Sequence, residues 1–470
     1  MEALLDQADA LVLTAGEDGA ERPDFEIPEE LVPFTTPRDI LEIRENPNKG
    51  KGLFATRHLP AGTILLVAKP LSWALDSEWE GGVPDEEIED MEEDSEHPAE
   101  PVESHVNELL VLETIQMIKE DPALWLEKIC NLYPRDAVDI DASPVWISKD
   151  DDIFAQFEKM VLELETVPGL EGKSHEISKR VPLIIRYNVL SMETCPELLS
   201  YPGPTGHSPL AGVGLYFWPS FFNHDSRPNA SRFAVGDIMW FVANQDITAG
   251  EEVCISYLEH DILCESAYRR NIMLTLDFKE DEDTSSVVVD GPGIPVVDSE
   301  VQNELMGMNP FERLDSIDQL MQQAAGEAMP EGLDVEEDGM EGHGEVWFEC
   351  DMQNLRILKA ITLDGMGLSN KALDLWEKCV EFTETRLPPN DESSIVVRVQ
   401  AALCAWTMGE EDRARVHAVK ALQVHNLMFG GGVRRFRRRY QKEFCLNLRK
   451  ESIRDGKAAH DCLWPYDSDM

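Results

Sequence analysis

The sequence predicts an α+β protein, because two β-rich segments flank a helical segment and a second helical segment follows them. Turn residues break the segments 39–71 and 212–278 into short β-rich runs such as Ile238–Ala243. Between 106 and 201, and again between 346 and 450, apolar residues recur at the i, i+3 and i+4 spacing of helices. With 470 residues, 43% of them hydrophobic, the chain can form about two to four domains with cores of their own.

The composition is strongly acidic, with 41 Lys and Arg against 91 Asp and Glu and a formal net charge of −50. A field of this sign repels nucleic-acid phosphates and anionic membrane surfaces, so we expect neither as a direct partner. It favours basic, lysine-rich protein segments; an acidic surface that only maintains solubility is the alternative. Asp76–Glu103 and Glu327–Asp351 contain many acids and no Lys or Arg, and we expect both to be loops.

The nine cysteines are scattered and form no C-x-x-C pair. The first ten residues carry acids and lack the basic region of a signal peptide. Apolar runs such as Ile64–Ala68 are far shorter than the ~20 residues of a membrane span. These features predict a protein of a reducing compartment, cytoplasmic and/or nuclear.

The first stretch suited to chemistry is Asn48–Phe54, in which Gly50 and Gly52 flank Lys51. Two glycines around one residue allow the backbone to approach a ligand closely and expose its amide groups. Considered alone, the same pattern is also that of an ordinary turn after a strand.

Two further stretches combine aromatic and polar residues. In Phe221–Asn229, two phenylalanines lead into Asn223 and His224, and a buried asparagine needs partners for its amide. In Ala249–Tyr257, a turn and a β-rich run lead to the terminal tyrosine. Considered singly, these residues have structural alternatives, namely a satisfied core histidine and a tyrosine that closes a strand.

The order of these stretches resembles that of a SET domain. The matching segments are Gly50–Thr56, Leu59–Ile64, Gly212–Tyr216, Asn223–Asn229 and Asp246–Tyr257. The arrangement is most similar to the SET and MYND-domain lysine methyltransferases and to related SET proteins with tetratricopeptide-like C-termini. The resemblance covers about 39–75 and 182–278 in detail, and the last helical segment only in architecture.

The resemblance implies an α+β chain with a SET-domain β-fold, a pseudoknot, a helical insert and an α-helical, tetratricopeptide-like C-terminal domain. The expected divisions are an N-terminal extension 1–37, the first SET part 38–75, an acidic loop 76–105, the helical insert 106–205, the second SET part 206–280, an acidic linker 281–345, helical hairpins 346–450 and a tail 451–470.

Residue by residue, the resemblance implies an S-adenosylmethionine site. Its members would be the loop residues Gly50, Lys51 and Gly52 around the methionine part, Asn223 and His224 on the amino acid and adenine, and Phe278 as the covering aromatic. Tyr257 matches the catalytic tyrosine near the transferring methyl group. For Phe278 a core position is the alternative.

The function implied is S-adenosylmethionine-dependent methylation of lysines in histone or non-histone proteins, by a monomer that binds a basic segment of its substrate. The alternative is a catalytically weak SET scaffold that binds partner peptides through its helical C-terminal domain. The presence of Tyr257 favours the enzyme, whereas a change in the motif that follows the Asn-His pair favours the scaffold. Where the family has Ser-Cys after the Asn-His pair, this chain has Asp225-Ser226.

A structural zinc is not expected. The family cysteine after the Asn-His pair joins a post-SET C-x-C-x-x-C cluster, and Asn271–Asp283 contains no cysteine. Because Ser226 stands at the position of that family cysteine, both halves of the post-SET zinc site are absent together. The MYND zinc finger is missing as well.

The C-terminal segment shows a weak repeat. Gly367, Ala372 and Lys378 recur 42 residues later as glycine, alanine and lysine, which favours stacked helical hairpins over an ordinary bundle. Arg434–Arg439 is a basic island, for which a nuclear address or nucleic-acid contact and a pairing with the protein's own acids are both open.

Overall fold

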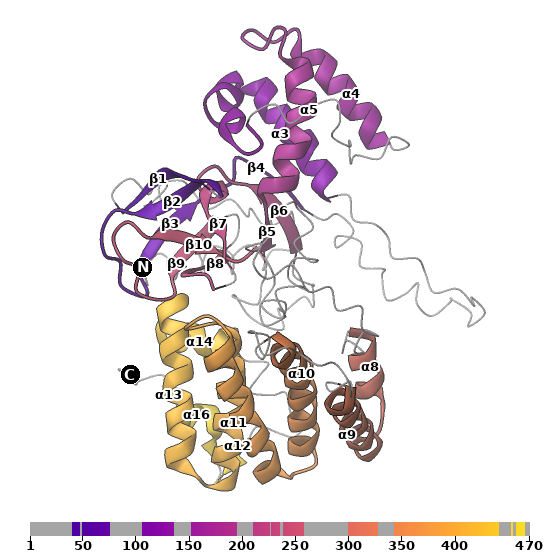
Figure 1. Ribbon diagram of the computed structural model, residues 1–470, viewed down its shortest axis with the longest axis vertical. Helices are drawn as coiled ribbons and strands as arrows, with labels where there is room; N and C mark the ends of the chain where they lie inside the picture. The colour runs from indigo at the N-terminus through magenta and orange to yellow at the C-terminus, as the bar shows by residue number, and fades with distance from the viewer. Residues whose placement is uncertain are drawn as a thin grey trace, which may run out of the picture.

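The computed structural model describes residues 40–47, 49–75, 106–135, 152–194, 210–225, 227–235, 238–257, 299–327, 343–440, 453–454 and 457–465. Small sheets form the first half, a group of helices projects from them, and a second group of helices lies at the opposite end (Figure 1). The fold is therefore α+β, as the sequence predicts. The expected acidic loop 76–105 and Phe278 lie outside the described residues.

Three sheets make up the β part. The first contains β1 (Leu41–Asn46), β2 (Gly50–Ala55), β10 (Glu252–Ile255) and β7 (Asn223–His224), in that order. The second contains β3 (Ile64–Ala68), β9 (Ile238–Ala243) and β8 (Ala230–Val235), and the third contains β4 (Ser72–Leu75), β6 (Leu210–Leu215) and β5 (Val189–Thr194). Each sheet joins strands from both sides of the insert.

The pairing of β10 explains how the two sequence halves meet. It pairs antiparallel with β2 on one side and parallel with β7 on the other. Leu53, Val253 and Ile255 are buried in this sheet, so apolar burial fixes its register. The sheet thus brings the glycine loop, the Asn-His pair and the last strand together where the resemblance implies a pseudoknot.

The insert is helical for most of its length. Its elements are α3 (Val106–Glu120), the short helices Leu124–Lys128 and Ile129–Asn131, α4 (Asp152–Leu164) and α5 (Ser174–Asn188). Val189–Thr194, expected to be helical, instead forms β5 and pairs with β6 from Val189↔Leu215 to Thr194↔Leu210. One apolar core joins insert and sheets, including Ile115 and Ile184 with Phe222.

The C-terminal region is built of helices that pack on their chain neighbours. They are α10 (His343–Gly365), α11 (Ser369–Arg386), α12 (Ser393–Met408), α13 (Glu411–Met428) and α14 (Gly432–Arg439), followed by β11 (Ile453–Arg454), β12 (Lys457–Ala458) and α16 (Ala459–Leu463). The expected acidic linker 281–345 is wrong in part, because it contains α8 (Ser299–Gly307) and α9 (Pro310–Glu327). The expected loop Glu327–Asp351 is also wrong from residue 343 onward, where α10 begins.

The 42-residue repeat has a structural counterpart. Gly367 and Gly409 both adopt positive φ, +79° and +83°, at the turns that precede α11 and α13. Ala372 and Ala414 are both fully buried where these helices pack on their neighbours. Consecutive helices α10 to α13 pack on one another, which fits hairpins; the tetratricopeptide likeness remains a prediction.

The basic island Arg434–Arg439 forms the end of α14, and three of its arginines turn toward the protein. Arg437 pairs with Asp461, and Arg439 pairs with Glu392 at 2.7 Å. Arg435 is buried and lies 5.6 Å over the ring of Phe233. Pairing with the protein's own groups therefore accounts for these three side chains.

The C-terminal helices contact the second sheet directly. The ring of Phe233 on β8 meets that of Phe429 at 5.1 Å, edge to face. Asn390 donates a hydrogen bond to the carbonyl of Asn244, 2.7 Å away. Figure 1 shows α13 and α14 below the strands.

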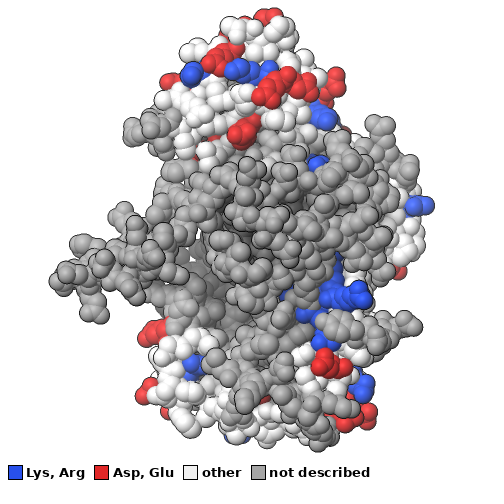
Figure 2. All heavy atoms as spheres, turned by 180° about the vertical axis from the view of Figure 1, so that it is seen from behind, with Lys and Arg blue, Asp and Glu red and all other residues white. Residues whose placement is uncertain are grey.

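Figure 2 shows acids and bases interspersed on the insert. No helix in the described part of the chain is long and apolar enough to cross a membrane.

Candidate active site

Strand register places several polar residues on one face of the first sheet. Asn46 lies opposite Gly50, and Glu252 lies opposite Phe54. Side chains alternate along strands and directly paired residues share a face, so Asn46, Glu252 and the position of Gly52 share one face. Asn223 pairs with Cys254, two residues after Glu252, and therefore joins the same face.

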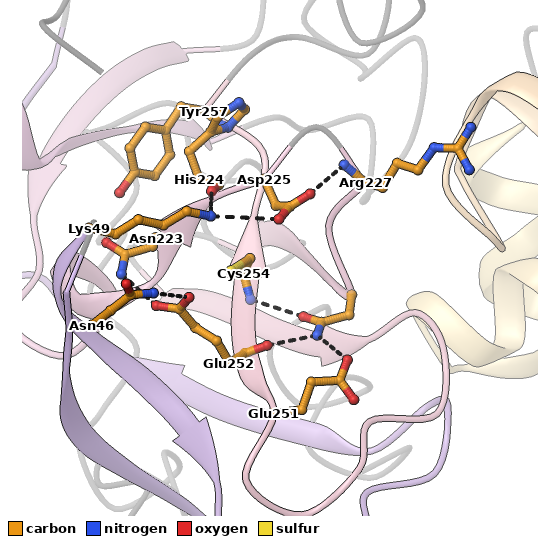
Figure 3. A network of polar contacts seen from close by, with 11 residues as sticks. Asn46, Lys49, Asn223, His224, Asp225, Arg227, Glu251, Glu252, Cys254 and Tyr257 are labelled. Atoms are coloured by element: carbon orange, nitrogen blue, oxygen red, sulfur yellow. Dashed lines mark hydrogen bonds and ion pairs between the residues drawn. The ribbon is translucent and has the colours of Figure 1, made fainter. Parts of the chain in front are cut away.

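These residues form a hydrogen-bond network around the Glu252 carboxylate (Figure 3). Asn46 Nδ2 donates to Oε2 and Asn223 Nδ2 donates to Oε1, each at 2.7 Å. Asn223 Nδ2 also lies 3.5 Å from the Lys51 carbonyl oxygen. A Cβ at Gly52 would overlap Glu252 Oε1 and lie 2.7 Å from Asn223 Nδ2. Only glycine leaves room for this close approach.

Lys49, in the turn before β2, connects this strand to β7 and the residue that follows it. Its Nζ donates to the carbonyl oxygen of His224 at 3.0 Å and lies 3.6 Å from Asp225 Oδ2. The negative charge of Asp225 therefore has a basic partner in the turn before β2, and the ion pair links the two segments electrostatically.

Tyr257 lies two residues beyond the end of β10 and contacts β7, which holds His224, and Phe222 just before it. Its backbone N–H donates to His224 Nδ1 at 3.0 Å, and its hydroxyl donates to the Phe222 carbonyl oxygen at 2.8 Å. Burial is the main cause of a raised pKa of the Tyr257 hydroxyl, and nearby Cys254 and Glu252 add to the effect. The phenol therefore keeps its proton at neutral pH. His224 Nδ1 accepts the backbone hydrogen bond and so carries no proton itself.

Asn229 supports the network from behind. It is buried, donates to Glu251 Oε1 at 3.0 Å and to the Glu252 carbonyl oxygen at 2.8 Å, and accepts from the Cys254 N–H at 2.9 Å. Burial acts to raise the pKa of Glu251, but hydrogen bonds from Thr248 and Asn229 outweigh it and leave this pKa lowered. The start of β10 is thereby fixed in place.

A cavity of about 270 Å³ opens beside this network. It is lined by Asp225, Arg227, Asn229, Gln245, Glu251, Glu252 and Cys254. Burial raises the pKa of the Cys254 thiol to about 12, with Glu252 adding to the effect. The thiol is therefore protonated at neutral pH and is a poor nucleophile.

The structure thus brings together most residues that the sequence singled out. Lys51, Gly52, Asn223, His224 and Tyr257 lie within one connected set of contacts. Gly50 begins β2 with φ +77°, and apart from its chain neighbours no atom of the described residues lies within 4 Å of a Cβ built on it. Their roles toward a cofactor remain predictions, and Phe278 cannot be placed among the described residues.

The sequence did not single out three participants, namely Asn46, Lys49 and Glu252. Glu252 carried a signal, because it is an acid at the start of a strand whose other residues are buried. Asn46 and Lys49 lie in turn-rich sequence, where polar residues are common and carry no such signal. Among the described residues, no group of three or more His, Cys, Asp or Glu could hold a metal ion.

Comparison with protein families gives one match. Residues 50–258 match the family model described as the SET domain. This range contains β2 to β10, the insert and Tyr257, and with them Gly52, Asn223, His224 and Glu252 of the polar network. Strand β1 with Asn46, and Lys49, lie just before it. The chain contains a SET-domain β-fold followed by a helical C-terminal region. A comparison with curated proteins finds no match.

Solved structures give only distant similarity. The SET domain of LSMT bound to lysine and AdoHcy has 12% identity and a TM-score of 0.26, with coverage of 90% of this chain and 93% of that one. Rubisco LSMT bound to AdoMet has 13% identity and a TM-score of 0.26, with coverage of 83% and 90%. TM-scores this low do not support structural argument, so the assignment rests on the SET-domain match.

Proposed function

We propose that the chain is an S-adenosylmethionine-dependent protein-lysine methyltransferase. The proposal is supported by the SET-domain match over residues 50–258. The observation that carries it is that Tyr257, His224 and the glycine loop, distant in sequence, meet in one set of contacts. Bound S-adenosylmethionine supplies a methyl group already activated on a sulfonium centre.

The described residues fit this cofactor in two respects. Gly52 leaves the backbone bare where any side chain would collide with Glu252 and Asn223. Asn223 directs its Nδ2 to two acceptors, Lys51 and Glu252, so its Oδ1 faces the other way and can accept from the ammonium group of an amino-acid moiety. Gly50 and Lys51 would add contacts to the cofactor through their backbone groups.

The remaining chemistry falls to the protein's side chains. A lysine ammonium has a pKa of about 10.4, so one proton must leave before the amine can attack. Partial burial of the site favours the neutral amine by desolvation. Tyr257, held protonated and fixed through Phe222 and His224, would orient the amine and the methyl group in line.

The substrate class follows from charge. With a net charge of −50, the chain attracts basic segments, so we propose lysine-containing basic regions of histone or non-histone proteins. Cytoplasmic and/or nuclear localisation and a monomeric state belong to the same proposal.

One observation favours the scaffold alternative. The Asn223 amide and His224 Nδ1 are already engaged within the protein, as they would be in a vestigial site. In that case the helical C-terminal region would bind partner peptides and no methyl transfer would occur.

Calorimetric titration of the full chain with S-adenosylhomocysteine distinguishes the two functions. The enzyme proposal predicts saturable binding of one molecule per chain. Absence of binding at millimolar ligand, with the protein shown to be folded by circular dichroism, would contradict the enzyme proposal and favour the scaffold.

A further inference from the structure

We propose that Glu252 is a positioning residue for Asn223, and that it fixes the orientation of the asparagine amide that the cofactor needs. This inference rests on the proposed function and adds a residue to its site. Glu252 itself makes no contact with the ligand in this account, because both of its carboxylate oxygens are occupied by neighbouring amides.

The carboxylate links three strands. Glu252 lies on β10, accepts from Asn46 on β1 through Oε2, and accepts from Asn223 on β7 through Oε1, each at 2.7 Å. Hydrogen bonds to an ionised acceptor are about twice as strong as neutral ones. The half-buried site further strengthens them relative to exposed contacts.

These bonds select one of two orientations of the Asn223 amide. An asparagine side chain can rotate by about half a turn and exchange its oxygen and nitrogen with little change of shape. Both groups that face Nδ2, the Glu252 carboxylate and the Lys51 carbonyl, can only accept. The reversed amide would place Oδ1 against a carboxylate, so Glu252 holds Oδ1 turned away from itself.

Glu252 can occupy this place only because residue 52 is a glycine. A Cβ at Gly52 would overlap Glu252 Oε1. The glycine therefore has a second function beside close approach to a ligand, which is to admit the carboxylate that orients Asn223. This relation predicts that changes at Gly52 and Glu252 will not be additive.

The first test is Glu252→Gln in the full chain. The amide has nearly the same shape but presents one donor and one acceptor, so one of the two asparagines must face an N–H group. We expect binding of S-adenosylhomocysteine to weaken about 10- to 100-fold. The matched control is Glu120→Gln, because Glu120 on α3 also accepts from a side-chain amide, that of Gln116, and we expect this variant to retain its affinity.

The second test reverses the direction of the hydrogen bond. Asn223→Asp alone places two carboxylates together and should weaken binding at least as much as Glu252→Gln. In the double variant Asn223→Asp with Glu252→Gln, the glutamine donates to the aspartate, still accepts from Asn46, and leaves one aspartate oxygen for the ligand. We expect the double variant to bind at least about tenfold more tightly than either single variant.

The outcomes separate the two proposals. If the wild-type chain fails to bind S-adenosylhomocysteine, the proposed function is wrong and the positioning role falls with it. If the wild type binds and Glu252→Gln binds equally well, only the positioning role is overturned. Equal losses in all three variants, without recovery in the double variant, would also overturn it, because a merely structural role predicts no rescue.

Discussion

The backbone N–H of Tyr257 donates a hydrogen bond to Nδ1 of His224 across 3.0 Å, although 32 residues separate them in the sequence. The same tyrosine returns to Phe222 through its hydroxyl at 2.8 Å. The segment after β10 is therefore attached twice to the Asn-His turn. Both bonds fix the position of the one side chain that the account places at the transferring methyl group.

Tyr257→Phe should reduce methyl transfer on the order of a hundredfold, because the hydroxyl that orients the reacting groups is lost. Binding of S-adenosylhomocysteine should change little, since the bond from the backbone N–H to His224 remains. Single-turnover transfer of a labelled methyl group measures the first effect and calorimetry the second. A variant with wild-type turnover would remove Tyr257 from the mechanism.

Gly52→Ala should weaken binding of S-adenosylhomocysteine at least about tenfold and lower the free energy of unfolding by about 1–3 kcal/mol. The added methyl group would overlap Glu252 and crowd Asn223. Gly307→Ala is the control, because among the described residues no neighbouring side chain or strand comes within 4 Å of a Cβ at that position. Calorimetry and urea unfolding measure the two effects; wild-type affinity in Gly52→Ala would contradict the packing described around Glu252.

Acid should destabilise the C-terminal region through His425. This histidine is fully buried among the rings of Phe429, Phe436 and Tyr440. Burial, followed by the positive charges of Arg439 and Arg435, lowers its pKa well below 6.5.

The sign of the pH effect follows from proton uptake. Below pH 6.5 the unfolded chain binds a proton at this histidine and the folded chain does not, so the free energy of unfolding falls as pH falls. His425→Leu should reduce this loss by about 1 kcal/mol between about pH 6.5 and about pH 5.5. Urea unfolding at both pH values measures this difference, and His175→Gln, at an exposed histidine, is the control. A pH dependence of the unfolding free energy that is the same in His425→Leu as in the wild type would contradict the prediction.

Glu392→Ala should lower the free energy of unfolding by about 2 kcal/mol. Its Oε1 accepts from Arg439 Nε and Nη2 at 3.1 and 2.7 Å, and the guanidinium lies 4.1 Å over Phe429. Removing the acid leaves a largely buried charge unpaired. Glu410→Ala is the matched control, since Glu410 shares an exposed pair with Arg413 and should cost less than about 1 kcal/mol. Equal losses of unfolding free energy in the two variants, measured by chemical denaturation, would contradict the difference between the largely buried pair and the exposed pair.

Local patterns account for what the sequence could predict. The strand Ile238–Ala243 was expected with the bounds that β9 has, because a continuous β-rich run lies between turn residues. The stretch Gly50–Gly52 and the Asn223-His224 pair can likewise be identified from the sequence alone, because each is a short contiguous motif. Tyr257 was expected at the end of its strand and lies two residues beyond it.

Features set by pairing could not be predicted in this way. The contact between Glu252 and Asn46 depends on the register of β10 on β2 and of β2 on β1, which no local pattern gives. Val189–Thr194 follows directly on α5 and becomes a strand because β6 is available to pair with it. Tertiary context overrides local propensity in both cases.

Transfer of a labelled methyl group to lysine is the decisive experiment for methyltransferase activity. The full chain is incubated with S-adenosylmethionine labelled on the methyl group and with a lysate, and the labelled residues are mapped by mass spectrometry. The account predicts label on lysine side chains of basic protein segments, and on the order of a hundredfold less label with Tyr257→Phe. Absence of labelled lysine, or equal labelling by the Tyr257→Phe variant, would contradict it.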